Sequence, residues 1–406
     1  MNRYDELKQS LLDKIVKKID LSRSVEDTEV QEIIDDCVID ISRENYLNSK
    51  QKEKLAKELF FSIRKLDILQ ELIDDTSVTE IMVNGTNNIF VEKSGHLIKW
   101  VSHFKNQEKL EDVIQQIVAN CNRVVNESSP IVDARLENGS RVHVVLPPVA
   151  LNGPILTIRR FPETPISMLD LINYKSLDMA VAMFLEKLVK AGYNIFISGG
   201  TGSGKTTFLN ALSHYIPKDE RIITIEDSAE LQIQGIPNLV RLETRNANVE
   251  GCKEISIRNL IKASLRMRPD RIIVGEVRGE EAIDMIQCLN TGHDGSLSTG
   301  HANSARDMLS RLETMILMGI DLPLPAIRRQ IASGIDIIIH LGRCRDGSRK
   351  VLEIIEVIGF CENEIITEPL FEFEEETETI DHQIIGKLNK KKELKHTEKL
   401  ISKGIQ

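Results

Sequence analysis

The segment GGTGSGKT, residues 199–206, has the residue types and spacing that bind phosphate groups. It matches the pattern G-x-x-x-x-G-K-[ST], in which glycines let backbone amides surround phosphate oxygens and the following helix adds the positive end of its dipole. Lys205 is predicted to contact the β- and γ-phosphates, and the Thr206 hydroxyl to bind Mg²⁺. A glycine-rich turn that binds nothing is the weaker alternative, because an apolar strand and an amphipathic helix flank the segment. The predicted nucleotide-binding residues are Gly199, Gly200, Thr201, Gly202, Ser203, Gly204, Lys205, Thr206 and Thr207.

An acidic segment follows a second predicted strand. ITIEDSAEL, residues 223–231, ends in a group of carboxylates at Glu226, Asp227 and Glu230. Strand ends on this side of a parallel sheet open into the ligand crevice, so these side chains are placed to position Mg²⁺ or a water molecule. We expect Glu226 to be a metal ligand. The alternative is an acidic loop that contacts only solvent.

A further carboxylate follows a third predicted strand. RPDRIIVGEVRG places Glu276 and Arg278 directly after the strand Arg271–Val274. An apolar strand that delivers a carboxylate beside the phosphates has the geometry of a Walker B motif, so Glu276 is predicted to bind the metal ion. A positioned general base contributes roughly 10²–10⁴ in rate, and Glu276 and Glu230 are both candidates for directing the attacking water. We favour Glu276 for the Walker B role and Glu230 for polarising the water.

Two histidines lie in the Gly/Ser/Thr-rich segment TGHDGSLSTGHANS. His293 and His301 are eight residues apart, and no carboxylate or cysteine at matching spacing completes a zinc site. A structural hydrogen-bonding role is the alternative to a catalytic one for both residues.

Length and composition limit the number of domains that hold these motifs and the partners that they can bind. A chain of 406 residues can bury two or three separate cores. Its 52 basic and 62 acidic residues give a formal charge of −10, which disfavours nucleic acid as a partner. Six scattered cysteines without a CxxC pair suggest neither a disulfide framework nor a zinc clip, and fit a reducing cytoplasm.

The sequence divides into four predicted regions. Apolar residues at helical spacing predict a helical bundle over 1–73. Alternating apolar residues interrupted by Asn-Gly and Ser-Gly pairs predict an α+β domain over 74–163, ending at the linker FPETPIS. Strands that alternate with helices predict a doubly wound α/β domain over 164–360. Separate acidic and basic runs with few apolar residues predict a flexible tail over 361–406.

The first residues of the chain and its apolar segments indicate that it does not insert into a membrane. The first twenty residues carry charges throughout and lack the apolar core of a signal peptide. No segment reaches the roughly 18 apolar residues of a membrane span, so we expect any work at a membrane to require docking to an embedded partner.

Taken together, these motifs resemble the P-loop, Asp box, Walker B and His box of the type II/IV secretion ATPase superfamily. The stretches ENGSRVHVVLPP, GPILTIRRFP, RLETRNANVEG, SLRMRPDRIIVGEVRG, NTGHDGSLSTGHANS, SRLETMILM and RDGSRKV are most similar to its CpaF (TadA) branch, which powers Tad-type pili. The Asp box EDSAE and the absence of a four-cysteine zinc subdomain favour that branch over pilus extension and retraction motors. The resemblance covers about residues 75–360.

The resemblance implies a RecA-like P-loop ATPase core, an α+β, PAS-like N-terminal domain and a preceding helical bundle. It also implies a homo-hexamer that binds ATP and Mg²⁺ and is cytoplasmic, docked peripherally on the membrane through inner-membrane platform proteins. His301 would sense the γ-phosphate. Arginines of the N-terminal domain would close on the phosphates, and surface arginines or hairpin salt bridges are the alternative. The matching arginines are Arg135, Arg141, Arg159 and Arg160.

Two other classes of protein remain open from sequence. A nucleic-acid translocase could use the same core, although 17 aromatic residues leave few for base stacking. A nucleotide-binding scaffold would bind ATP without releasing phosphate.

Overall fold

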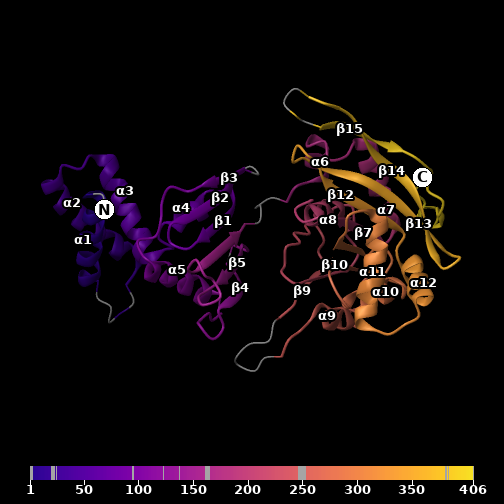
Figure 1. Ribbon diagram of the computed structural model, residues 1–406, viewed down its shortest axis with the longest axis horizontal. Helices are drawn as coiled ribbons and strands as arrows, with labels where there is room; N and C mark the ends of the chain where they lie inside the picture. The colour runs from indigo at the N-terminus through magenta and orange to yellow at the C-terminus, as the bar shows by residue number, and fades with distance from the viewer. Residues whose placement is uncertain are drawn as a thin grey trace. The chain divides into compact units, whose positions relative to one another are not determined.

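The computed structural model describes residues 3–19, 23, 25–93, 96–121, 123–136, 138–160, 165–245, 253–379, 382 and 384–405. The chain forms two compact units, Met1–Pro162 and Glu163–Gln406, and many of their elements are labelled in Figure 1. The predicted boundary at 163/164, most of the FPETPIS linker and the Ser94-Gly95 turn lie outside the described residues.

The helices predicted for the N-terminal region are present. They are α1 (Arg3–Lys18), α2 (Asp27–Asn45), α3 (Ser49–Arg64) and α4 (Leu69–Asp74). The first three share a core that includes Leu11, Ile34 and Leu59. Asn48 begins α3 by accepting from the Gln51 amide, while the Gln51 side chain accepts from the Asn48 amide, which satisfies two helix-end donors. α4 instead packs on the core of the following sheet.

A six-stranded antiparallel sheet completes the first unit, in the order β3-β2-β1-β6-β5-β4. Its members and its helix are β1 (Val78–Asn84), β2 (Asn88–Lys93), β3 (His96–Lys99), α5 (Gln107–Asn120), β4 (Ile131–Arg135), β5 (Arg141–Val145) and β6 (Ile155–Arg159). One face buries Val142 and Ile158 against Ile114 and Ile117 of α5. Alternate residues of the same strands therefore form the opposite face, which α5 does not cover.

The second unit is built on a nine-stranded sheet in the order β15-β14-β13-β12-β7-β11-β10-β8-β9. The run from β12 to β9 is parallel, and β13, β14 and β15 are antiparallel. The strands are β7 (Ile195–Gly199), β8 (Ile222–Glu226), β9 (Leu239–Glu243), β10 (Arg271–Val277), β11 (Leu297–His301), β12 (Ile337–Arg343), β13 (Arg349–Cys361), β14 (Glu364–Glu378) and β15 (Ile384–Lys390).

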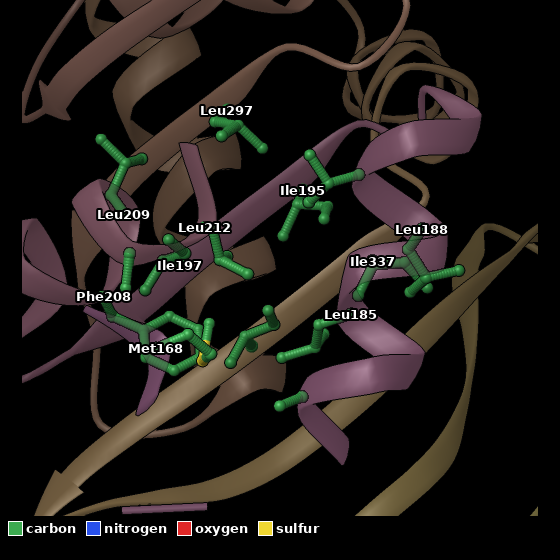
Figure 2. Close-up of a cluster of buried hydrophobic side chains, with 14 of the residues drawn as sticks. Met168, Leu185, Leu188, Ile195, Ile197, Phe208, Leu209, Leu212, Leu297 and Ile337 are labelled. Atoms are coloured by element: carbon green, nitrogen blue, oxygen red, sulfur yellow. The ribbon is translucent and has the colours of Figure 1, made fainter. Parts of the chain in front are cut away.

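Helices cover both faces of this sheet, because successive strand residues point to opposite sides. Ile195 and Ile197 of β7 belong to one core, seen in Figure 2 beside Leu185 and Phe208, and Phe196 belongs to the other. The first core is covered by α6 (Met168–Asn173), α7 (Met179–Ala191) and α8 (Lys205–Ser213). The second is covered by α9 (Ile257–Ser264), α10 (Glu281–Leu289), α11 (Ala305–Gly319) and α12 (Leu324–Gly334).

The prediction of a flexible tail over 361–406 is wrong. Most of the described part of that region forms β14, β15 and the short helix α13 (Glu398–Ser402). The acidic run and the basic run lie on facing strands, so their charges compensate each other across the pair, as in the Lys387–Glu376 contact of 3.4 Å. Leu388 and Phe371 supply the apolar contacts that the charge runs obscured.

Lys399 attaches α13 to the start of the parallel strands. Its ammonium nitrogen lies 2.7 Å from Asp336 Oδ2 and 2.8 Å from Asp294 Oδ1, and it sits over the Tyr193 ring. The Tyr193 hydroxyl donates to the His396 carbonyl oxygen. The C-terminal residues are therefore an integral part of the second unit.

Candidate functional site

Four of the predicted motifs meet at the carboxyl ends of neighbouring strands. The glycine-rich loop follows β7, Glu226 ends β8, Glu276 lies near the end of β10 and His301 ends β11. Because the strand order is β7-β11-β10-β8, these ends lie side by side along one edge of the parallel sheet. This edge is where ligands bind in open α/β sheets.

The glycine-rich loop combines close packing with open space. A Cβ at Gly199 would lie 2.4 Å from the Leu341 carbonyl oxygen, so only glycine fits there. Gly204 has a φ of +93°, a conformation that favours glycine, and it is the N-cap of α8. A Cβ at Gly200 or Gly202 would meet nothing within 4 Å, which leaves room beside the loop for a ligand.

Lys205 is held inside this loop. The side chain is buried, and Nζ donates to the carbonyl oxygens of Gly199 at 3.2 Å and Gly200 at 2.9 Å. Burial lowers the pKa of Lys205, against the opposing effect of Glu276. Phosphate oxygens can replace the two carbonyl partners. Buried Ser203 Oγ, for which no hydrogen-bond partner is found among the described residues, adds a further donor, so the loop fits a phosphate chain.

Glu276 is the centre of a charged group formed with Arg278, His301 and Lys205. Its Oε2 accepts from Arg278 Nη2 at 2.7 Å, and its Oε1 lies 2.7 Å from His301 Nε2. The other ring nitrogen of His301, Nδ1, is 3.3 Å from Lys205 Nζ. Burial and the nearby Lys205 lower the pKa of His301, which favours the neutral imidazole. The ring thus lies between the carboxylate and the loop lysine, although Glu276 Oε1 has no hydrogen-bond partner in the described part of the chain.

Glu226 faces into its own loop. Its Oε1 accepts from the amides of Glu230 and Leu231, both at 2.8 Å, and a Cβ at Gly275 would lie 2.8 Å from Glu226 Cγ. Burial raises the pKa of Glu226 to about 7. Oε2 has no hydrogen-bond partner in the part of the chain that the structure describes. The carboxyl group thus shapes the loop that carries Glu230, a role the sequence did not predict.

The remaining loop residues border the same edge. Thr206 and Thr207 are half-buried in the first turn of α8, while Thr201 is exposed. Within the described ranges, no group of three or more His, Cys, Asp or Glu side chains is placed to hold a metal ion.

His293 is not brought to this edge. It precedes β11, at the opposite end of the strand from His301, and its Nδ1 lies 3.2 Å from the Cys288 carbonyl oxygen. Its surroundings match the structural alternative.

Three of the four predicted arginines form a row on the sheet of the first unit. Arg135 pairs with Arg141 across β4 and β5, and Arg141 pairs with Arg159 across β5 and β6. Directly paired residues share a face, and here it is the face that α5 does not cover. Arg135 Nε donates to the Gly139 carbonyl oxygen at 3.1 Å, and Arg141 Nη2 lies 3.3 Å from Asp133 Oδ1, a salt bridge within the β4–β5 hairpin. Arg160 follows the end of β6, and its guanidinium donates to the Asp75 carbonyl oxygen.

Two contacts at the loop were not predicted from the sequence. Arg349, at the start of β13, donates from Nε to the Gly202 carbonyl oxygen at 2.7 Å. Ser198, just before the loop, lies 2.9 Å from buried His340 Nδ1. The stretch RDGSRKV that contains Arg349 carried a family resemblance, but no sequence signal assigned it a contact.

A glycine-rich phosphate loop after a central parallel strand, with carboxylates at adjacent strand ends, defines the domain as a P-loop nucleotide-binding domain. Residues 63–393 match the family described as "Type II/IV secretion system protein". The chain belongs to this family, and it is an ATP hydrolase.

Named relatives support the same family. The chain is 35% identical over 293 residues to a putative conjugal transfer protein of Mycobacterium tuberculosis, covering 71% of this chain and 83% of the relative. It is 33% identical over 324 residues to the conjugal transfer protein TrbB of Rhizobium radiobacter, covering 78% and 96%. It is 33% identical over 317 residues to the type IV secretion system protein PtlH of Bordetella pertussis, covering 71% and 93%.

Among solved structures, the fold is similar to the ATPase DotB of Legionella pneumophila. The TM-score is 0.51 at 22% identity, over 72% of this chain and 80% of that one. These relatives support membership of the family, but they do not specifically support the CpaF (TadA) branch. No helix among the described residues is long and apolar enough to cross a membrane.

Proposed function

We propose that this chain is a hexameric motor of the CpaF (TadA) branch, which uses ATP hydrolysis to power Tad-type pilus assembly or secretion. The observation that carries the motor chemistry is the contact series Lys205–His301–Glu276–Arg278 at the phosphate-binding edge of the sheet. The branch rests on the Asp box EDSAE and on the motif stretches around Arg349 and Glu276. Conjugal transfer and type IV secretion, the systems named for its relatives, are the neighbouring alternatives.

The side chains at this edge have the chemistry that hydrolysis needs. Lys205 binds the β- and γ-phosphates. Thr206 and Glu276 would hold Mg²⁺, and Glu226 is a third candidate ligand through Oε2; the bound ion would offset phosphate charge. Glu276 and Glu230 are the two candidates for directing the attacking water, and we favour Glu230 for polarising it. His301, linked to both Glu276 and Lys205, responds to the γ-phosphate because either partner shifts when phosphate binds.

The arginine row would add positive charge to that of Lys205 in the loop. Charge spreads over the equatorial oxygens of the γ-phosphate in the transition state, and arginines stabilise it there. We propose that Arg135, Arg141 and Arg159 act in this way on the ATP of the same or a neighbouring subunit. Arg160 is the fourth candidate and the weakest, because it lies outside the register that pairs the other three.

Replacing Arg141 or Arg159 with alanine is therefore expected to lower kcat by about 10²-fold or more, with a smaller change in ATP affinity. Steady-state kinetics and nucleotide titration measure the two effects separately. Arg123→Ala removes an arginine of the same unit from outside the strands of the sheet, and serves as the matched control. Equal loss in all three variants would contradict a specific role for the row.

The partner and the assembly can be tested together. We propose that the motor is cytoplasmic and docks on an inner-membrane platform protein. Purification with that protein, followed by ATPase assay and particle imaging, is expected to show a six-fold ring whose turnover rises when the platform protein is present. Stimulation by DNA instead, lost at high salt, would favour a translocase and overturn the proposal.

A further inference from the structure

We propose that Arg349 is a positioning residue for nucleotide binding, which holds the Gly202–Ser203 peptide group of the phosphate loop in its binding orientation. This inference rests on the proposed binding of ATP at the loop. Arg349 does so from β13, a strand outside the parallel core.

The peptide group between Gly202 and Ser203 is bonded at both ends. Its carbonyl oxygen accepts from Arg349 Nε at 2.7 Å, and its N–H, from Ser203, donates to the Gly200 carbonyl oxygen at 3.3 Å. Carbonyl and N–H point in opposite directions in a trans peptide, so fixing one fixes the other. Arg349 therefore determines which way the Ser203 N–H points.

This peptide group needs a contact from outside the loop, because the glycines beside it can adopt several backbone conformations. Gly202 has a φ of +71° and Gly204 a φ of +93°, and glycine changes conformation at little steric cost. A reversed peptide would turn the carbonyl oxygen of Gly202 towards the Gly200 carbonyl oxygen, where two acceptors repel, and would turn the Ser203 N–H the opposite way. The guanidinium bond to that oxygen is charge-assisted and opposes the reversal.

Arg349 is itself fixed by its backbone. Its carbonyl oxygen accepts from Ser176 Oγ at 2.7 Å, and Val351 N donates to the Ser176 carbonyl oxygen at 2.9 Å. Its side chain is exposed, and its Cδ lies 3.5 Å from the position that a Cβ on Gly204 would occupy. The side chain thus lies along the loop while the main chain is held elsewhere, so truncation removes the loop contact without removing the anchor.

The turn before Arg349 is tied to the C-terminal hairpin. Asp346 accepts from the Ser348 amide at 2.9 Å and from the Ile384 amide of β15 at 2.8 Å. Arg345 of the same turn pairs with Glu378 of β14 at 3.0 Å. The β14–β15 hairpin therefore fixes the turn that presents Arg349 to the loop.

The test compares Arg349→Ala with Arg343→Ala. Arg343 is the exposed cross-strand partner of Arg349, so its loss removes the same charge from the same place. Arg349→Ala is expected to raise the Kd for Mg·ADP and the KM for ATP about tenfold, with kcat at saturation little changed. Arg343→Ala should stay within about twofold of the wild type. Arg349→Lys, which keeps the charge, should recover part of the affinity.

Several outcomes would overturn the inference. These are an unchanged Kd in Arg349→Ala, an equal rise in Arg343→Ala, or a lower kcat at constant KM. Lys205→Ala separates this inference from the proposed function. If Lys205→Ala abolishes binding but Arg349→Ala leaves it intact, only the positioning role fails. If Lys205→Ala also binds normally, the loop is not the nucleotide site.

A double substitution tests the route from the hairpin. If Asp346 acts through Arg349, Asp346→Ala raises the Kd, and the Asp346→Ala/Arg349→Ala double variant binds no more weakly than Arg349→Ala alone. Additive losses would show that the turn affects the site by another path and would contradict this route.

Discussion

Lys205→Ala is expected to lower kcat/KM for ATP by at least about 10²–10³-fold, because it removes the ammonium that meets the β- and γ-phosphates. Nζ already lies within 3.2 Å of the Gly199 and Gly200 carbonyl oxygens, so the charge is preorganised at the loop. Nucleotide titration and phosphate-release assays measure the loss.

The same substitution should leave the protein folded. Burial lowers the pKa of Lys205, which means that its charged form is disfavoured in the folded state, so removing the charge does not by itself weaken folding. A thermal melt without nucleotide checks this. Lys187→Ala, an exposed position on α7, is the matched control and should retain activity. Normal ATP turnover in Lys205→Ala would contradict the proposal that this protein is an ATP-driven motor.

Glu276→Gln is expected to bind ATP with near-normal affinity and to hydrolyse it about 10²–10⁴-fold more slowly. The amide keeps the size of the side chain and can still accept from Arg278, but it cannot accept a proton from water or attract it as a carboxylate does. Single-turnover hydrolysis and nucleotide titration separate the two quantities.

Glu280→Gln is the control for Glu276→Gln. Glu280 lies four residues away, and its contact at 3.2 Å is with Arg258, outside the charged group. Glu230→Gln, tested in parallel, shows which of the two glutamates directs the attacking water. If Glu276→Gln hydrolyses ATP at the wild-type rate while Glu230→Gln does not, Glu230 is the residue that directs water.

The loop, its strand and its helix could be predicted because their signals are local. Gly204 and Lys205 stand at a fixed spacing between an apolar strand and an amphipathic helix, and the structure places β7 and α8 there. Glu276 was predicted beside the phosphates because it follows an apolar strand, but its contact of 2.7 Å with His301 could not be derived from spacing.

What sequence could not predict depends on contacts between distant residues. Arg349 reaches Gly202 across 147 positions, because β13 lies two strands from β7 in the sheet. The orientation of Glu226 depends on Gly275 of the neighbouring strand, which leaves space for its side chain. The C-terminal region looked unstructured because its acidic and basic runs were considered separately, while their pairing becomes visible only once β14 faces β15.

Because residues 361–406 include strands of the main sheet, the protein cannot be shortened at residue 360 without damage to that sheet. A fragment ending at residue 360 would leave β13 as a long outer strand with open hydrogen-bonding groups and would bare Ile354, now buried beside Leu370 and Phe371. Such a strand invites pairing with another molecule, so the truncated protein would self-associate. It would also strip Asp336 of Lys399, leaving a carboxylate without its ammonium partner at the base of the strands. Shortened forms of this protein should therefore retain residues 361–406.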